Sequence, residues 1–231
     1  MNGLSARCHM SDPDVDVPRQ MMVAEICAQT IFLASRLGKA VLDRRVLEAM
    51  GSVPRHLFVP HELRPLAYAD TPLPIGYGKT ISQPFIVGLM TDLLQLRPTD
   101  TVLEVGTGLG YQAAVLARLA RHVYSIEVIE ELAVGARQRL KSLGCRNVEV
   151  SVGDGRAGWP AHAPFDKIIV TAAPDLIPPA LIYQLAPGGR MVIPAGLADA
   201  QQLLLVEKKA DDTISTREVL PVRFSVLEES G

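Results

Sequence analysis

Three glycines alternate directly after the apolar run VLEV, in the sequence Gly106-Thr107-Gly108-Leu109-Gly110. Glycines at the end of a strand let a ligand approach the backbone beneath the N-terminus of the next helix. The same pattern also occurs in turns that only connect a strand to a helix. It therefore indicates a candidate cofactor-binding turn that needs support from other residues.

Two acidic residues supply this support, because each follows one of the next apolar runs along the chain. Glu127 ends HVYSIE, 21 residues after Gly106, and Asp154 lies between two glycines after NVEVSV. A carboxylate at the first position can accept hydrogen bonds from both hydroxyls of a ribose, whereas Gly-Asp-Gly is also an ordinary turn. Open α/β sheets bind ligands at the carboxyl ends of their strands, so the three positions together predict one nucleotide-type site.

The spacing of the glycines distinguishes between cofactors. A dinucleotide-binding turn has its third glycine where this chain has Tyr111. That glycine permits close packing of helix and strand, which a tyrosine side chain hinders. The glycine spacing therefore departs from the dinucleotide fingerprint, although the carboxylate of Glu127 would serve NAD as well.

A hydroxyl group in a different part of the chain is the candidate for chemistry. The stretch Ala69–Pro84 is rich in proline and glycine, which favour a stiff, shaped loop. Its Ser82 precedes a helical run that begins at Pro84, where a hydroxyl could cap the helix or orient an anion. Asp70 could close the loop through backbone N–H groups or contact a substrate. From the residues alone, capping is the better interpretation of Ser82.

Composition limits the classes of protein to which the chain can belong. It has 231 residues, 48% of them hydrophobic, which is enough for one sizeable core. Lys and Arg number 23 against 25 Asp and Glu, without a basic stripe, which disfavours a nucleic-acid partner. No apolar run reaches the ~18 residues of a membrane span, and the first residues lack the apolar segment of a secretion signal.

Cysteine and histidine usage favours a cytoplasmic protein without a metal site. Cys8, Cys27 and Cys145 are odd in number and widely spaced, which disfavours a disulfide framework. The five histidines do not fall at metal-ligand spacings. We therefore expect a cytoplasmic protein with no metal and with no nucleic-acid or membrane partner.

The first hundred residues are predicted to be mainly helical. Residues 21–37 place apolar side chains on one side of a helix that Gly38 ends. Asp43 is a candidate N-cap for a short helix that Gly51 closes, and the following SVPRHLFVP is expected to be extended. A further helix is predicted over Pro84–Leu96.

The later part of the chain alternates between strands and helices. TVLEVGTG, HVYSIEV, NVEVSVGD, DKIIVTAA and GRMVIPAG predict a parallel sheet covered on both faces. QQLLLVEKK and STREVLPVRFSVL are separated only by a charged turn, which predicts an antiparallel pair. We expect one α/β domain with a doubly wound, mostly parallel seven-stranded sheet. Residues 1–20 would be a flexible tail, 21–98 a helical extension with the substrate loop, and 99–231 the cofactor-binding core.

Several stretches resemble, in order and spacing, those of protein-L-isoaspartate O-methyltransferases. They are LFVPHELRPLAYADTPLPIGYGKTISQP, VLEVGTGLGYQAAVLA, VYSIE, GDG, FDKIIVTAA and LAPGGRMVIP, within about residues 46–227. The resemblance implies the sheet of S-adenosylmethionine-dependent methyltransferases and S-adenosyl-L-methionine as cofactor. It further implies isoaspartyl-containing proteins and peptides as substrates, whose free α-carboxylate is methylated to begin repair.

The resemblance also implies roles for individual residues. Ser82 would be the catalytic residue that orients the substrate carboxylate, and no metal would take part. A carboxylic acid with a pKa near ~4 is already ionised at pH 7, so no general base is needed. The implied cofactor-binding residues are Thr80, Gly106, Thr107, Gly108, Glu127, Asp154 and Gly155.

Two departures from the family pattern concern the substrate side. The family usually has Gln at the position of Lys79, and V-R-F-V-P-L where residues 222–227 are VRFSVL. Lys79 could attract the substrate carboxylate or be a solvated loop charge. Two alternatives stay open: methylation of normal aspartate in one dedicated peptide, and a module that binds S-adenosylmethionine or a peptide without turnover.

Overall fold

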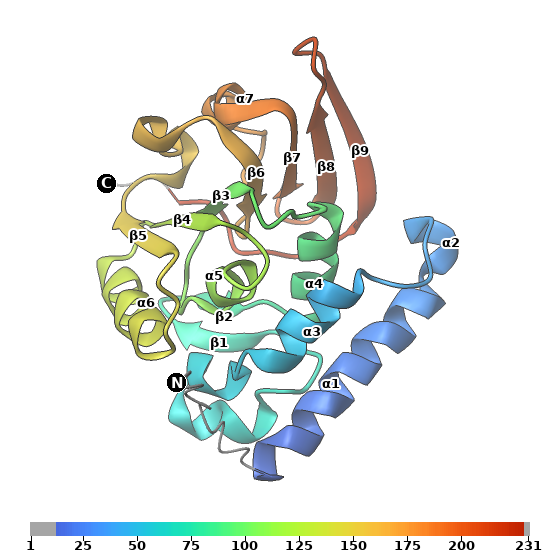
Figure 1. Ribbon diagram of the computed structural model, residues 1–231, viewed down its shortest axis with the longest axis vertical. Helices are drawn as coiled ribbons and strands as arrows, with labels where there is room; N and C mark the ends of the chain where they lie inside the picture. The colour runs from blue at the N-terminus through green and yellow to red at the C-terminus, as the bar shows by residue number, and fades with distance from the viewer. Residues whose placement is uncertain (1–12, 229–231) are drawn as a thin grey trace, which may run out of the picture.

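The computed structural model describes residues 13–228, and its centre is a seven-stranded sheet (Figure 1). The first five strands in the order across the sheet are parallel, and the last two continue the sheet in antiparallel fashion, which confirms the predicted architecture. The order across the sheet is β5 (Val148–Val152), β4 (His122–Glu127), β3 (Thr101–Val105), β6 (Phe165–Val170), β7 (Leu185–Ala195), β8 (Gln202–Lys208) and β9 (Ile214–Pro221).

The strand order reverses between β3 and β6. The chain moves outward from β3 to β4 and β5, then returns to β6 on the other side of β3. Helices α5 (Tyr111–Leu116) and α6 (Glu130–Ser142) cover one face of the sheet, and α7 (Pro179–Gln184) covers the other (Figure 1). A strand between two covered faces is mostly apolar, and all five residues of β3 are buried, Glu104 among them. The reversal creates a crevice at the carboxyl ends of β3 and β6, where such sheets bind ligands.

Four further helices pack on the face that carries α5 and α6 (Figure 1). They are α1 (Pro13–Phe32), α2 (Ala34–Leu37), α3 (Arg44–Ser52) and α4 (Pro84–Leu93). Helix α1 begins earlier than the predicted residue 21, so residues 13–20 are helical and not part of a tail. Pro18 lies inside α1 without ending it. Residues 1–12 of the predicted tail lie outside the described residues.

Gly38 and Asp43 cap helices as predicted, but the predicted last residues of two helices are wrong. Gly38 adopts φ +71° and ends α2, and the Asp43 side chain accepts a hydrogen bond from the Arg45 N–H at 2.8 Å. Helix α3, however, continues past Gly51 to Ser52, and α4 ends at Leu93 and not at Leu96.

The proline- and glycine-rich stretch before α4 contains a hairpin and is less irregular than predicted. Strands β1 (Leu73–Gly76) and β2 (Lys79–Ile81) pair antiparallel. Tyr77 and Gly78 join them at φ +54° and +67°, the left-handed region that a tight hairpin turn requires. The preceding segment is not extended as predicted. Within the SVPRHLFVP stretch that was predicted to be extended, the 3₁₀ helix η1 (Arg55–Phe58) forms, and η2 (His61–Leu66) follows that stretch. Each of these helices has a proline at its N-cap.

The last described residues do not continue the edge strand as predicted. Strand β9 ends at Pro221, because proline has no N–H for the ladder. Residues 222–228 then return toward the end of β6, where Val226 forms a bridge with Ala173. The side chain of Gln201 accepts a hydrogen bond from the Phe224 N–H at 2.6 Å and holds this C-terminal segment in place.

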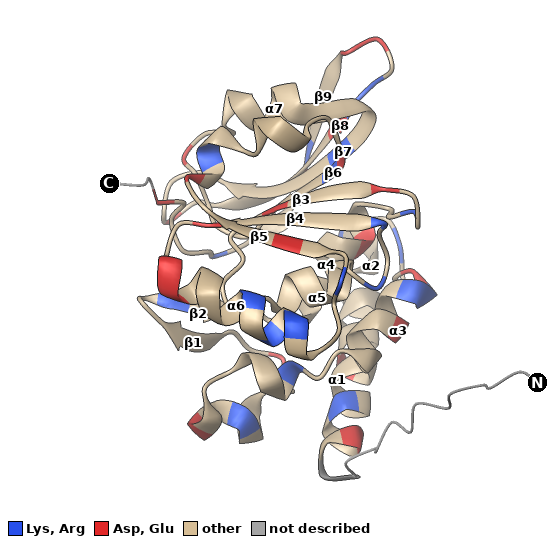
Figure 2. Ribbon diagram, turned by 60° about the vertical axis from the view of Figure 1, so that its left-hand side comes forward, with Lys and Arg blue, Asp and Glu red and all other residues tan. Residues whose placement is uncertain are grey.

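Charged side chains of both signs are distributed over the molecule. Figure 2 shows Lys and Arg interspersed with Asp and Glu along the ribbon. This distribution is the one expected from the nearly balanced composition of 23 basic and 25 acidic residues. Basic side chains are concentrated near the beginning of β6 and β7.

Candidate active site

A cavity of about 580 Å³ lies at the carboxyl ends of the central strands. Its lining includes Val105 at the end of β3, Glu127 at the end of β4 and Thr171 just after β6. The β1–β2 hairpin, the start of α4 and residues 220–228 provide the remaining walls. The cavity therefore occupies the crevice predicted by the strand order, and segments far apart in the sequence enclose it.

The turn after β3 has a shape that depends on glycine. Gly106 has φ +95°, and a Cβ atom at this position would lie 2.4 Å from the hydroxyl oxygen of Thr171. The Thr171 hydroxyl donates a hydrogen bond of 2.6 Å to the Gly106 carbonyl oxygen, which fixes the close approach. As a result Gly106 and Gly108 present backbone atoms to the cavity.

Glu127 presents its carboxylate to the cavity although the residue is only 6% exposed. One carboxylate oxygen accepts a hydrogen bond of 2.7 Å from the Gly108 N–H, and the other accepts one of 3.1 Å from the Ile129 N–H. These bonds join the end of β4 to the glycine turn. Each oxygen keeps a lone pair with which it can accept a hydrogen bond from a hydroxyl group.

A buried polar network lies beneath the glycine turn. The hydroxyl groups of Thr107 and Ser125 are 2.5 Å apart, and Ser125 donates a hydrogen bond to Glu104. Complete burial raises the pKa of Glu104 to about 8, against the weaker opposing effect of Ser125. Thr107 is therefore directed into the interior and supports the turn from below, and it does not line the cavity.

Tyr111 occupies the position where a dinucleotide-binding turn has its third glycine. Its ring lies 4.8 Å from the Arg55 guanidinium carbon and packs edge-on against Phe58, with ring centroids 5.5 Å apart. Burial raises the pKa of the Tyr111 hydroxyl to about 12. The tyrosine thus anchors the helical extension to α5, which explains why a bulky residue is accommodated there.

Ser82 lies between β2 and α4 and lines the cavity. Its carbonyl oxygen accepts a hydrogen bond of 2.8 Å from Nη2 of Arg55, whose Nε donates one of 2.8 Å to the Ala67 carbonyl oxygen. The N-cap position of α4 belongs to Gln83, so the capping role that the residues alone favoured for Ser82 is wrong. Within residues 13–228, the Ser82 hydroxyl makes no hydrogen bond.

Asp70 performs the capping that Ser82 does not. Its carboxylate accepts hydrogen bonds from the Phe85 N–H at 2.7 Å, from the Gln83 side chain at 2.6 Å and from the Gln29 side chain. Asp70 is not among the residues that line the cavity. Of its two predicted roles, the structure therefore supports closure of the loop.

Lys79 is not a free loop charge. Its Nζ lies 2.6 Å from a carboxylate oxygen of Glu228, and the Lys79 side chain is 18% exposed. Both residues line the cavity. The pair therefore joins the hairpin to the C-terminal segment, in the two regions where the sequence departs from the family pattern.

The structure brings Ser82 to the same cavity as five of the seven predicted cofactor residues. These five are Thr80, Gly106, Gly108, Glu127 and Gly155. Besides Thr107, the exception is Asp154, whose carboxylate accepts a hydrogen bond of 2.8 Å from the Arg156 N–H and caps a 3₁₀ turn. Direct contact of each residue with a cofactor stays a prediction.

Sequence reasoning missed two buried residues that shape the site. Arg55 is completely buried, and both of its hydrogen-bond acceptors are backbone carbonyl groups. Because any residue type offers a carbonyl, no pattern in the sequence could identify the partners of Arg55. The role of Ser125 was also missed, although a serine inside the apolar run VYSIE is a signal that a buried polar contact exists.

Two further features are absent from residues 13–228. No group of three or more His, Cys, Asp or Glu there could hold a metal ion. No helix in the same range has the length and apolar character needed to cross a membrane. The thiols of Cys27 and Cys145 are free.

The chain is similar to a family of known proteins over most of its length. The family model for protein-L-isoaspartate(D-aspartate) O-methyltransferases matches residues 28–230. Protein-L-isoaspartate O-methyltransferase 1 of Polaromonas sp. (strain JS666) is 69% identical over 221 residues, which are 96% of this chain and 94% of that protein. The protein of the same name from Cupriavidus necator (strain H16) is 58% identical over 207 residues, 89% of this chain and 80% of the relative.

Solved structures share the fold. A protein-L-isoaspartate O-methyltransferase with 28% identity superposes with a TM-score of 0.74, covering 88% of this chain and 66% of that one. A putative enzyme of the same name from Plasmodium falciparum, solved with S-adenosyl-L-homocysteine, is 22% identical with a TM-score of 0.76. It covers 91% of this chain and 98% of its own, and this similarity demonstrates the common fold.

Proposed function

The chain belongs to the protein-L-isoaspartate(D-aspartate) O-methyltransferase family, and we propose from this premise how its own residues carry out the reaction. The enzyme transfers a methyl group from S-adenosyl-L-methionine to the free α-carboxylate of L-isoaspartyl residues in proteins and peptides. When bound, S-adenosyl-L-methionine supplies a methyl group on a positively charged sulfur, which is reactive without further activation. The ester product can lose methanol to form a succinimide, which starts repair.

The cofactor side of the proposal rests on the glycine turn and Glu127. The positive φ of Gly106 and the absence of side chains at Gly106 and Gly108 leave backbone atoms exposed to the cavity. Glu127 adds a carboxylate whose remaining lone pairs can accept from the two ribose hydroxyls. Thr80 and Gly155 complete the lining from the hairpin and from the turn after β5. These residues fit the proposed cofactor.

The assignment of a substrate-binding residue rests on one observation. Ser82, whose hydroxyl makes no hydrogen bond within residues 13–228, lines the same cavity as Glu127. Arg55 holds the Ser82 backbone from the buried side, so the hydroxyl is positioned by a rigid support. A neutral donor can orient a carboxylate without removing the negative charge that attacks the methyl group. We therefore assign the orientation of the substrate carboxylate to Ser82.

The surroundings favour an anion next to Ser82. Helix α4 begins two residues later at Pro84, and the positive end of a helix dipole stabilises a nearby negative charge. The isoaspartyl carboxylate is ionised at neutral pH, so the enzyme needs to position it and not to deprotonate it. Apolar residues of the walls, such as Ile75 and Phe85, exclude water from the reacting groups.

The organisation and location of the enzyme belong to the same proposal. Residues 21–98 would provide the helical extension and substrate loop, and 99–231 the cofactor-binding core, within one domain. Its partners would be isoaspartyl-containing proteins and peptides. The free thiols of Cys27 and Cys145 support a cytoplasmic location, because a reducing compartment keeps such thiols unpaired.

Paired peptides test the substrate assignment. Two peptides that differ only in carrying isoaspartate or aspartate are incubated with the enzyme and labelled S-adenosyl-L-methionine, and methanol released from the ester is counted. We expect turnover of the isoaspartyl peptide and at most background turnover of the aspartyl peptide. Preference for normal aspartate would favour a dedicated aspartyl methyltransferase. Absence of any ester would favour a binding module.

A further inference from the structure

A second, polar hollow of about 750 Å³ lies away from the carboxyl ends of the strands. It is lined by the end of α4, the beginning of β6 and β7, and the end of β8. Basic side chains dominate it: Lys39, Arg45, Arg97, Lys167, Arg190, Lys208 and Lys209 are opposed by only three carboxylates, those of Asp43, Asp92 and Glu207. We call this hollow the basic basin. None of its residues lines the active-site cavity.

Strand register places two cations side by side on the floor of the basic basin. Lys167 of β6 is paired with Arg190 of β7, and Arg190 is paired with Glu207 of β8. Directly paired residues project from the same face of a sheet, so Lys167 and Arg190 are immediate neighbours. Arg190 forms an ion pair of 2.6 Å with Glu207, whereas like charges at Lys167 and Arg190 repel.

Lys167 is the unusual member of the basic basin. The residue is 7% exposed, and within residues 13–228 its ammonium group has neither a hydrogen bond nor an ion pair. Burial lowers the pKa of Lys167, and Arg190 and Arg97 lower it further, although Asp100 and Asp166 act in the opposite direction. Although most of the side chain is buried, the Lys167 ammonium group reaches the solvent in the basic basin, where an anion can contact it.

The carboxylates near Lys167 are already engaged. Asp100 accepts a hydrogen bond from the Arg97 N–H at 2.8 Å, and Asp166 accepts one from the Thr101 N–H at 2.8 Å. Neither lies within ion-pair distance of Lys167. They attract the lysine through space and do not neutralise it locally.

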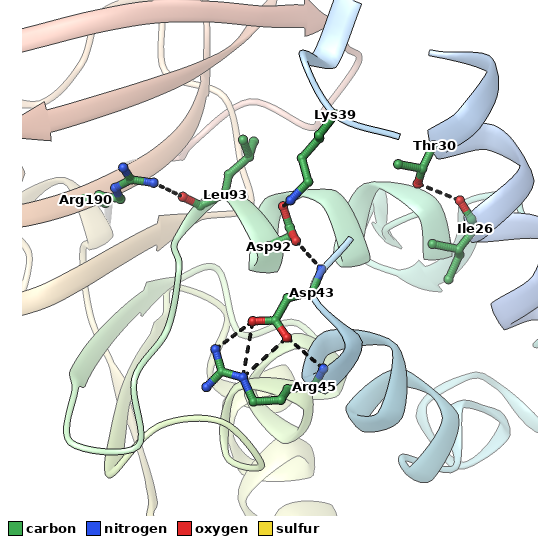
Figure 3. A network of polar contacts seen from close by, with 8 residues as sticks. All are labelled: Ile26, Thr30, Lys39, Asp43, Arg45, Asp92, Leu93 and Arg190. Atoms are coloured by element: carbon green, nitrogen blue, oxygen red, sulfur yellow. Dashed lines mark hydrogen bonds and ion pairs between the residues drawn. The ribbon is translucent and has the colours of Figure 1, made fainter. Parts of the chain in front are cut away.

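The carboxylates that line the basin are also paired. Figure 3 shows Asp92 between Lys39, at 2.6 Å, and the backbone N–H of Asp43, at 2.6 Å. The Asp43 carboxylate in turn binds the Arg45 side chain, at 2.6 Å from its nearest nitrogen (Figure 3). With Glu207 bound to Arg190, each lining carboxylate already has a cation. Lys208 is paired with Asp212, so Arg97, Lys167 and Lys209 remain without a carboxylate within residues 13–228.

We propose that the basic basin binds a compact polyvalent anion, namely a pyrophosphate or polyphosphate group, with Lys167 at its floor and Arg97 and Arg190 as further contacts. A lysine ammonium binds a phosphate oxygen as a point charge, and a guanidinium group can bind two oxygens at once. The three lining cations that lack a carboxylate partner within residues 13–228 match a group with several negative charges better than a single carboxylate. This site goes beyond methyl transfer and is independent of it.

Titration of the full chain with inorganic pyrophosphate tests the proposal. Binding is measured by calorimetry and by the shift in melting temperature, with sodium chloride used to keep ionic strength constant. We expect saturable binding with one site per chain and a higher melting temperature. Orthophosphate should bind at least tenfold more weakly, because it carries fewer charges. A melting shift no larger than that produced by sodium chloride alone would overturn the proposal.

Three variants locate the site. Lys167→Met should reduce pyrophosphate affinity at least tenfold. Arg97→Gln, which alters an exposed side chain without a hydrogen bond in residues 13–228, should reduce affinity severalfold and leave the fold intact. Lys141→Gln, an exposed lysine on α6, is the matched control and should bind as the wild type does.

The variants also distinguish the basic basin from the active-site cavity. Lys79→Gln should leave pyrophosphate binding unchanged, because Lys79 lines the other cavity. Loss of binding in Lys79→Gln together with wild-type binding in Lys167→Met and Arg97→Gln would contradict the proposal. Citrate at the same ionic strength should bind more weakly than pyrophosphate, and equal affinity would contradict the assignment to phosphate groups.

Discussion

The ammonium group of Lys79 and the carboxylate of Glu228 lie 2.6 Å apart, although 149 residues separate them in the sequence. Both line the active-site cavity, so the pair links the hairpin before α4 to the C-terminal segment beside the proposed substrate position. A substrate carboxylate that approaches this wall meets a cation whose charge is partly neutralised. The two residues should therefore influence substrate binding in opposite directions.

Lys79→Gln should raise KM for an isoaspartyl peptide, because the remaining Glu228 carboxylate repels an anionic substrate. Glu228→Gln should lower KM, because it releases the Lys79 charge. Both effects should be larger at low ionic strength, where the Debye length is about 30 Å, than at physiological ionic strength, where it is about 8 Å. The double variant is the matched control and should return KM close to the wild-type value. Shifts that do not depend on salt would show that neither charge acts on the substrate.

Glu127→Ala should weaken S-adenosyl-L-methionine binding by about 1.5 to 3 kcal/mol, the usual scale for lost hydrogen bonds to a charged acceptor. The variant also leaves the Gly108 N–H without its acceptor, which would loosen the glycine turn. Titration calorimetry measures the change, with Glu130→Ala as a control because Glu130 is exposed at the start of α6. Unchanged affinity would remove Glu127 from the cofactor site.

Glu104→Gln should change how stability depends on pH. The pKa of Glu104 rises from its ordinary 4.5 to about 8 in the folded protein, so between these values the folded state holds a proton that the unfolded state releases. The free energy of unfolding therefore falls as pH rises through this window, by on the order of a few kcal/mol in total. Gln cannot ionise, so the variant lacks this loss.

Urea unfolding of both proteins at a series of pH values measures the effect. Every other titrating group is common to wild type and variant, so the difference between the two curves isolates Glu104. We expect the wild type to lose stability relative to Glu104→Gln from about pH 5 to about pH 8. Parallel curves would show that Glu104 ionises normally in the folded state.

The sequence was sufficient to predict the sheet and the residues at the carboxyl ends of its parallel strands. Each parallel strand is a mostly apolar run, and the residues at the ends of these runs, such as Gly106 and Glu127, are brought together by the strand order alone. The resemblance to a known family also placed the loop that contains Ser82 correctly beside the carboxyl ends of these strands.

Hydrogen bonds between long side chains and backbone groups could not be predicted from the sequence. The acceptors of Arg55 are carbonyl groups at Ala67 and Ser82, and a carbonyl group is present at every residue. The return of residues 222–228 along the cavity depends on the Gln201 side chain, which lies far from any motif. Prolines also misled the prediction, because they fit the starts of η1 and η2 as well as an extended chain.

Steady-state kinetics of Ser82→Ala on one isoaspartyl peptide test the central claim most directly. If the Ser82 hydroxyl orients the carboxylate at the moment of transfer, kcat should fall tenfold or more, on the order of 1.4 kcal/mol or above. Affinity for S-adenosyl-L-methionine should barely change. Ser82→Thr, which keeps a hydroxyl, should retain more activity than Ser82→Ala, and Ser142→Ala on α6 should match the wild type. A Ser82→Ala enzyme with the wild-type kcat would contradict the account.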